Sequence, residues 1–262
     1  MNKRLFVVYG VICYLVFLIA FLWGVAFTGD LTPSALRAGA MPPFQALIVD
    51  LGLISLFGMQ HSIMARAGFK RWWLRSVPEP IERSTYVLLA SLALLLLFWQ
   101  WRPLPGVVWH VEQLLGHQLL WSLFWLGWLL VVVSTFAIDH FDLMGLRQLY
   151  THLHGTRPSP PAFKTSALYG VVRHPLMLGF LIAFWATPRM TLGHLLFALG
   201  MTAYILIGLR YEERDLLRTF GTAYQAYQRR VPMLIPLPRH QDDGAQPLEG
   251  PGADSLGGTD TA

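Results

Sequence analysis

The amino-acid sequence predicts an all-α integral membrane protein, a polytopic helical bundle with five to six transmembrane helices. Hydrophobic residues make up 54% of the 262 residues and charged residues only 13%, which is about half the charge of an ordinary soluble domain. The apolar residues gather in runs that match the roughly 20 residues needed to cross a bilayer as a helix. We therefore expect one membrane domain over residues 1–239 and a disordered cytoplasmic tail, rich in glycine, aspartate and proline, over residues 240–262.

Six apolar segments define the predicted bundle. They span about residues 5–27, 44–64, 84–101, 118–138, 175–187 and 190–209. The fifth is shorter than a full crossing, so the sequence allows either six spans or five spans and a half-span. The first is too long for a cleaved signal peptide, and we interpret it as a retained anchor. It contains Cys13, the single cysteine, so an intrachain disulfide and a cysteine-based zinc site are excluded.

Basic residues predict how the bundle is oriented. Most of the 20 Lys and Arg residues flank the segment ends on the side of the N-terminus, and only Arg37, Arg102 and Arg189 fall on the other side. Such a bias places both termini in the cytoplasm. The net charge of +5 is thus a topology signal, and we expect no nucleic-acid partner. The basic and aromatic residues 69–73 are typical of a segment at the headgroup level, which makes membrane lipids a partner.

Polar side chains sit at the two feet of a helical hairpin near the C-terminus. Arg173 and His174 precede the fifth apolar segment, and Glu212 and Glu213 follow the sixth. Charges placed so selectively at a membrane surface indicate function, although interfacial anchoring would use the same residues. Together they could hold a zwitterionic small molecule, the basic groups taking its carboxylate and a glutamate its amine.

An aromatic stripe follows the hairpin. Leu216, Phe220, Tyr224 and Tyr227 are spaced as one face of a helix, which we expect to leave the membrane and fold back onto the bundle. Aromatic rings there could take a flat ring or a cation. The sequence shows no glycine-rich phosphate loop and no dinucleotide fingerprint.

Histidines elsewhere in the sequence are weaker candidates for a functional role than the residues of the hairpin. His61 ends the second apolar segment, and His140 follows Asp139 after the fourth. A lone histidine at a helix end is more often a hydrogen-bonded structural residue. His152 and His154 are two residues apart and point to different faces of a helix, so we expect no metal site.

The hairpin motifs resemble a known family, the membrane methyltransferases related to isoprenylcysteine carboxyl methyltransferase and the phospholipid methyltransferases. The matching residues are Arg173-His174-Pro175, Gly179, Glu212-Glu213, Leu216, Phe220-Gly221, Tyr224, Tyr227 and Val231-Pro232. The resemblance implies S-adenosylmethionine as methyl donor, in a cytoplasmic site formed by the hairpin and the following helix. The donor-binding residues that it implies are Arg173, His174, Tyr211, Glu212, Glu213, Tyr224 and Tyr227. The family usually has Tyr two residues after the motif proline, and here Met177 removes that hydroxyl while it can keep the packing.

Three earlier segments resemble one bacterial branch, the methanethiol S-methyltransferases. These are residues 61–66 (His-Ser-x-Met-Ala-Arg), 78–86 and 139–148; related NnrU-like membrane proteins share the first. The resemblance implies methylation of the small volatile thiol methanethiol to dimethyl sulfide at the bacterial inner membrane. On the substrate side we expect the catalytic residues to come from His61, Arg83, Tyr86, Asp139 and His140.

Two further possibilities stay open at this point. The same machinery could methylate another acceptor, namely a lipid, a prenyl-cysteine or another small thiol. Alternatively, the chain could be a non-enzymatic NnrU-like membrane protein. The residue that deprotonates the thiol and the oligomeric state are left open as well.

Overall fold

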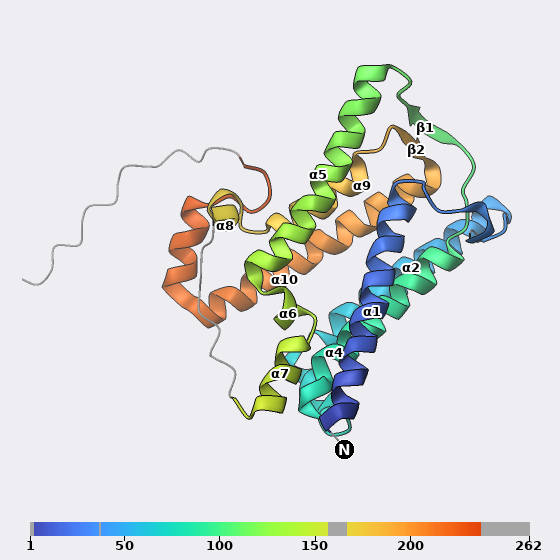
Figure 1. Cartoon of the computed structure of the whole chain (residues 1–262). Helices are drawn as coiled ribbons and strands as arrows, with labels where there is room; N and C mark the ends of the chain where they lie inside the picture. The colour runs from blue at the N-terminus through green and yellow to red at the C-terminus, as the bar shows by residue number, and fades with distance from the viewer. Residues whose placement is uncertain (1–2, 37, 157–166, 237–262) are drawn as a thin grey trace, which may run out of the picture.

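A computed structural model describes residues 3–36, 38–156 and 167–236. The predicted tail, residues 240–262, lies outside the described residues. Within the described residues, five helices are long and apolar enough to cross a membrane, and Figure 1 shows how they are arranged. They are α1 (Lys3–Thr28), α2 (Pro43–Met64), α4 (Glu79–Gln100), α5 (Leu114–Ile138) and α10 (Leu192–Arg230).

The fifth apolar segment forms a shorter helix. Helix α9 (Pro175–Trp185) has 11 residues, so it rises about 16 Å, roughly half of the hydrocarbon core. It packs along α5 (Figure 1). The backbones approach closely because both helices have a glycine at the contact: a Cβ atom on Gly179 would lie 2.7 Å from the carbonyl oxygen of Gly127. The prediction of five to six spans is confirmed as five long helices and one short one.

The remaining elements are short. They are the 3-10 turn η1 (Ser34–Leu36), the helices α3 (Ala67–Trp73), α6 (His140–Leu143), α7 (Leu146–His154) and α8 (Ala167–Val171), and the strands β1 (Val107–His110) and β2 (Arg189–Thr191). The two strands pair antiparallel, with Trp109 opposite Met190. They join the loop after α4 to the turn between α9 and α10.

A buried aromatic core holds the long helices together. Phe98 of α4, Phe124 of α5, Phe184 of α9 and Phe197 of α10 are all buried in one cluster. Met177 is partly buried and packs against the same cluster, as expected if it fills the space of the family's tyrosine. Cys13 is fully buried and free.

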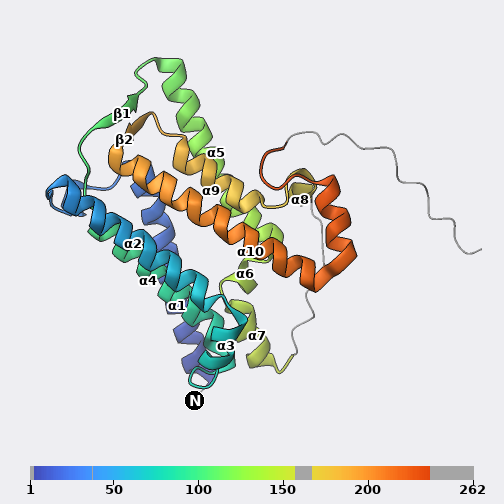
Figure 2. The ribbon, with the colours of Figure 1, turned by 180° about the vertical axis from the view of Figure 1, so that it is seen from behind.

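Helix α10 is much longer than a membrane crossing. Residues 192–209 are mostly apolar and rise about 27 Å, close to the thickness of the hydrocarbon core. The charged residues begin at Arg210, so we take the helix from there on to lie outside the membrane. At Gly221 the backbone has φ 53° and ψ −126°, a conformation that essentially only glycine adopts. The last part of α10 therefore turns back toward α8 and the start of α9, as predicted (Figure 2).

Candidate active site

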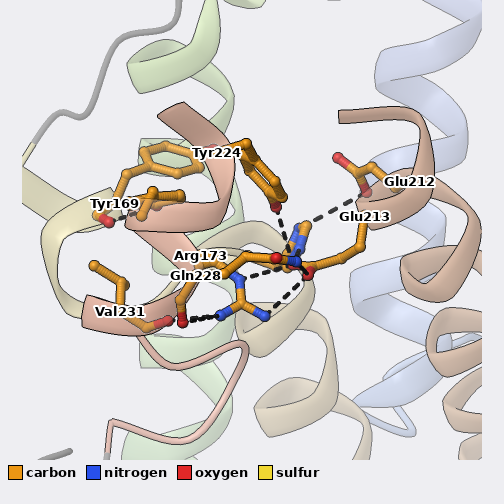
Figure 3. Close-up of polar contacts among 9 residues, drawn as sticks. Tyr169, Arg173, Glu212, Glu213, Tyr224, Gln228 and Val231 are labelled. Carbon is orange, nitrogen blue, oxygen red and sulfur yellow. Dashed lines mark hydrogen bonds and ion pairs between the residues drawn. The ribbon is translucent and has the colours of Figure 1, made fainter. Parts of the chain in front are cut away.

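Glu213 is the centre of a polar cluster at the start of α9 (Figure 3). The Arg173 guanidinium donates to both carboxylate oxygens, from Nε to Oε1 at 2.7 Å and from Nη2 to Oε2 at 3.0 Å. His174 donates from Nε2 to Oε1 at 2.8 Å. Paired bonds from one guanidinium to one carboxylate are strong and fix the orientation of both groups.

The folded-back end of α10 completes this cluster. The Tyr224 hydroxyl donates to Glu213 Oε1 at 3.0 Å, and the side-chain amide of Gln228 donates to Oε2. Nη1 of Arg173 donates to the carbonyl oxygens of Val231 at 2.7 Å and Gln228 at 3.2 Å. The Glu213 carboxylate and the Arg173 guanidinium thus join the start of α9 to the parts of α10 before and after the bend at Gly221.

Further hydrogen bonds to backbone groups hold α8 and the start of α9 against the last part of α10 and the residues that follow it. The amide of Arg173 donates to the carbonyl of Pro232 at 2.9 Å, and the amide of His174 to that of Met233 at 3.2 Å. The Tyr227 hydroxyl donates to the carbonyl of Tyr169 at 2.6 Å. The two tyrosines of the predicted aromatic stripe are therefore buried supports of the cluster, with Tyr224 only 1% exposed, whereas Leu216 and Phe220 are partly buried.

The charge state of the cluster follows from these bonds. Burial by itself raises the pKa of Glu213, but hydrogen bonds from Arg173, His174 and Gln228 outweigh it and bring the pKa to about 2. Burial also raises the pKa of the Tyr224 hydroxyl, and the neighbouring charge of Glu213 acts in the same direction. At neutral pH the Glu213 carboxylate is therefore charged, and the Tyr224 hydroxyl is protonated and donates a hydrogen bond to it.

Glu212 behaves differently from its neighbour. Consecutive residues of a helix point about 100° apart, so only Glu213 faces Arg173. The Glu212 side chain is 50% exposed, and its Oε2 lies 3.7 Å from Nδ1 of His174. The glutamate pair is thus divided into one residue that holds the structure together and one whose carboxylate stays accessible (Figure 3).

Tyr211 links this cluster to the end of α2. The guanidinium of Arg66 lies 4.2 Å from the centre of the Tyr211 ring, and that of Arg214 lies 5.9 Å from it. Tyr211 itself is 44% exposed. A half-exposed ring beside Glu212 offers a face to a flat or cationic ligand.

Three of the five substrate-side candidates lie together. His61 at the end of α2 is 2.9 Å from the Tyr86 hydroxyl through Nε2. Arg83 lies one turn before Tyr86 on α4, and its positive charge acts on both His61 and Tyr86. Nε of Arg83 donates to the carbonyl of Leu143 at 3.3 Å.

The other two candidates are held in separate interactions. His140 bonds to Tyr14 through Nε2 and to Thr135 through Nδ1, each at 3.0 Å. Asp139 forms an ion pair with Arg147 and accepts the amide of Asp142 at 3.0 Å. Asp139 thus holds the turn from α5 into α6 and joins it to α7, and His140 binds this turn to Tyr14 of α1. Neither residue forms a hydrogen bond with His61 or Tyr86 in the part of the chain that the structure describes.

Two residues of these clusters were missed in the sequence. Gln228 lies one helical turn after Tyr224 on the same face and is partly buried, but a single amide next to the aromatic stripe gives no signal in the sequence. Tyr204 lies inside an apolar run of α10, yet its ring is 6.2 Å from that of His61. Its spacing of seven residues from Tyr211, two helical turns, is the signal that could have found it.

Comparison with known proteins places the chain among characterised relatives. The model of the NnrU protein family matches residues 50–236. The chain is 56% identical over 243 residues to methanethiol S-methyltransferase of Mycobacterium tuberculosis, which covers 92% of this chain and all of the relative. It is 52% identical over 244 residues to methanethiol S-methyltransferase 2 of Bradyrhizobium diazoefficiens, 91% of this chain and 94% of the relative. Nurim of Bos taurus is 34% identical over 179 residues, 65% of this chain and 68% of the relative. No solved structure matches the chain.

Proposed function

Because the chain belongs to the NnrU family, together with the methanethiol S-methyltransferases, we propose that it methylates methanethiol to dimethyl sulfide with S-adenosylmethionine. The observation that carries the proposal is the convergence of the motif residues on one carboxylate. Side chains from residues 173–174 and 224–228, which are distant in sequence, meet at Glu213. The high identity to enzymes named for this reaction over almost the whole chain supports the same acceptor.

The side chains around the cluster fit a zwitterionic methyl donor. The accessible carboxylate of Glu212 suits the donor's ammonium group, and the half-exposed ring of Tyr211 suits its base or its positive sulfonium. A polar hollow of about 330 Å³ lies beside Arg173 and is lined also by Gln225, Gln228 and Arg229. In this arrangement Glu213, Arg173, His174, Tyr224 and Tyr227 position the residues that touch the donor.

A membrane site suits the charges of the reaction. The donor supplies a methyl group on a positive sulfur, and the thiol must react as an anion, so opposite charges disappear as the new bond forms. A poorly hydrated site favours such a reaction over the same reaction in water, provided that fixed protein dipoles replace the lost hydration. Positioning of the two sulfurs supplies much of the remaining acceleration.

The two reactants differ in how they would reach the site. The charged donor would enter from the cytoplasm, where the clusters of Glu213 and of His61 lie if both termini are cytoplasmic. Methanethiol is small and apolar and would enter through the bilayer. This orientation, and location in a bacterial inner membrane, belong to the proposal and rest on the distribution of Lys and Arg.

Headspace gas chromatography on the purified protein in nanodiscs tests the proposal. With S-adenosylmethionine and methanethiol we expect dimethyl sulfide that depends on both reactants. Saturable donor binding without dimethyl sulfide would direct the search to lipid or prenyl-cysteine acceptors. Neither product nor binding would favour a non-enzymatic membrane protein.

A further inference from the structure

Three long helices bring aromatic and polar side chains together around His61. The residue lies at the end of α2, and its ring is 5.1 Å from that of Tyr86 on α4 and 6.2 Å from that of Tyr204 on α10. Phe57, one turn earlier on α2, stacks at 5.5 Å. Tyr204 can approach α2 because residue 58 is glycine, where a Cβ atom would lie 3.2 Å from the tyrosine ring. The surroundings of the imidazole are thus mostly apolar.

The two ring nitrogens of His61 differ. Nε2 is 2.9 Å from the Tyr86 hydroxyl. Nδ1 is shielded from solvent and has no hydrogen-bond partner within the described part of the chain. A buried polar atom left unpaired is unfavourable, and such an atom calls for an explanation such as a bound ligand or a catalytic role.

The charged groups near the pair favour a negative ligand. Arg83 acts electrostatically on both His61 and Tyr86. Glu82 acts on Tyr86 with the opposite sign, but this buried carboxylate forms an ion pair with Lys70 at 3.0 Å, which offsets its charge. The positive charge of Arg83 would stabilise a thiolate beside the imidazole.

We propose that the thiol binds against His61, Tyr86 and Tyr204, and that Nδ1 of His61 takes its proton. This inference rests on the proposed function and names the acceptor site and the base. The Tyr86 hydroxyl lies 3.5 Å from the backbone carbonyl oxygen of His61, which can accept its proton. In the tautomer that we propose, Nε2 therefore donates to the Tyr86 oxygen at 2.9 Å, and the lone pair of the neutral imidazole is on Nδ1. Tyr86 is then a positioning residue that sets the tautomer, and Tyr204 is a wall of the acceptor site.

The step balances in atoms and charge. The S–H bond of the thiol breaks, its proton passes to Nδ1, and the resulting thiolate attacks the methyl carbon of the donor. A new S–CH₃ bond forms as the bond from the methyl group to the donor sulfonium breaks, which leaves two neutral thioethers. The imidazolium then returns its proton to water.

Helix α10 connects the acceptor site to the donor residues. Tyr204 and Tyr211 are two turns apart on the same face of the helix, a rise of about 10 Å. Tyr211 precedes Glu212, and Arg66 stacks on its ring at 4.2 Å. An elongated donor that binds Glu212 and Tyr211 therefore extends toward the acceptor site along this face.

The pH dependence of turnover by His61→Gln tests the inference. At pH 7 we expect the rate on methanethiol to fall about 10²- to 10⁴-fold, the usual contribution of a general base. The residual rate should then rise about tenfold per pH unit as free thiolate forms, up to the pKa of the thiol, which lies above about 8.5. Wild-type protein should show a much flatter profile, because it generates the thiolate itself.

Control variants separate a chemical role from a structural one. His152→Gln changes a histidine of α7 whose ring packs on Phe6, and it should keep the wild-type rate and profile. Tyr86→Phe should lower the rate by less than His61→Gln and leave the profile flat. Donor binding by calorimetry should be unchanged in all three variants if they are folded.

Two results would overturn the inference. One is a His61→Gln variant with the wild-type rate. The other is a His61→Gln variant whose loss of rate is the same at every pH. If that variant does not fold, a wild-type rate that itself rises tenfold per pH unit would overturn the inference, because the protein would then not generate the thiolate. Formation of dimethyl sulfide by the wild-type protein secures the proposed function in either case.

Discussion

Replacing Glu213 by alanine should lower the stability of the protein, whereas replacing its neighbour Glu212 should leave stability unchanged and weaken only donor binding. Glu213→Ala removes the partner of the Arg173 guanidinium, which is buried at 7% exposure, while the Glu213 side chain is largely buried at 12%. Breaking a buried ion pair costs about 3–5 kcal/mol because the other charge stays buried. At about 2–4 °C per kcal/mol for a chain of this size, the melting temperature should fall by about 6–20 °C.

Glu212→Ala should affect binding instead of folding. Its side chain is half exposed and its carboxylate lies 3.7 Å from His174, and an exposed ion pair contributes at most about 1 kcal/mol. If it holds the donor's ammonium group, the loss of one charged hydrogen bond costs about 1.5–3 kcal/mol. The dissociation constant for S-adenosylmethionine should then rise about 10- to 150-fold.

Thermal unfolding and calorimetric titration of both variants in the same detergent measure the two effects. We expect Glu213→Ala to lose stability and donor binding together, and Glu212→Ala to keep the wild-type melting temperature while binding weakly. Equal losses of stability in both variants would refute the division of roles between the two glutamates. So would a Glu212→Ala variant that binds the donor normally.

Three further predictions concern the bend, the charge of the cluster and the acceptor site. Gly221→Ala should cost about 1–3 kcal/mol through backbone strain alone, since no atom of the residues that the structure describes lies within 4 Å of the added Cβ atom; the melting temperature measures this cost, and an unchanged value would show that the bend is not required. Because the pKa of Glu213 is lowered from 4.5 to about 2, its contribution to stability should be complete above pH 4.5 and lost as the pH falls toward 2; melting curves across that range should show this loss in the wild type and not in Glu213→Gln. Tyr204→Ala should raise kcat/KM for ethanethiol relative to methanethiol by opening the wall beside His61, and an unchanged ratio would exclude Tyr204 from the acceptor site.

The apolar runs predicted the membrane helices well but not their ends. The run beginning near residue 84 belongs to a helix that starts at Glu79, and the run ending near 209 continues to Arg230. Hydropathy detects the part of a helix that lies in the hydrocarbon, whereas a charged helix end in water gives no such signal. The pairing of β1 with β2 was not predicted either, because it depends on the register of two segments far apart in sequence.

The site could be predicted as a set of motifs but not as a geometry. Arg173, His174 and Glu213 stood out because charges next to apolar segments are rare. Which of two neighbouring glutamates faces Arg173 depends on how α10 is rotated, and that rotation is set by tertiary packing. For the same reason the sequence could not show that His140 is engaged by Tyr14, which lies 126 positions earlier in the chain.

The most direct test of the account uses a donor whose reactive methyl group is deuterated. Purified protein in nanodiscs receives this S-adenosylmethionine and unlabelled methanethiol, and the headspace is analysed by mass spectrometry. We predict dimethyl sulfide in which one methyl group carries the deuterium, and a strongly reduced signal from Glu212→Ala at low donor concentration. Unlabelled dimethyl sulfide, or no dimethyl sulfide from protein that binds the donor, would contradict the transfer of a methyl group from this donor to methanethiol.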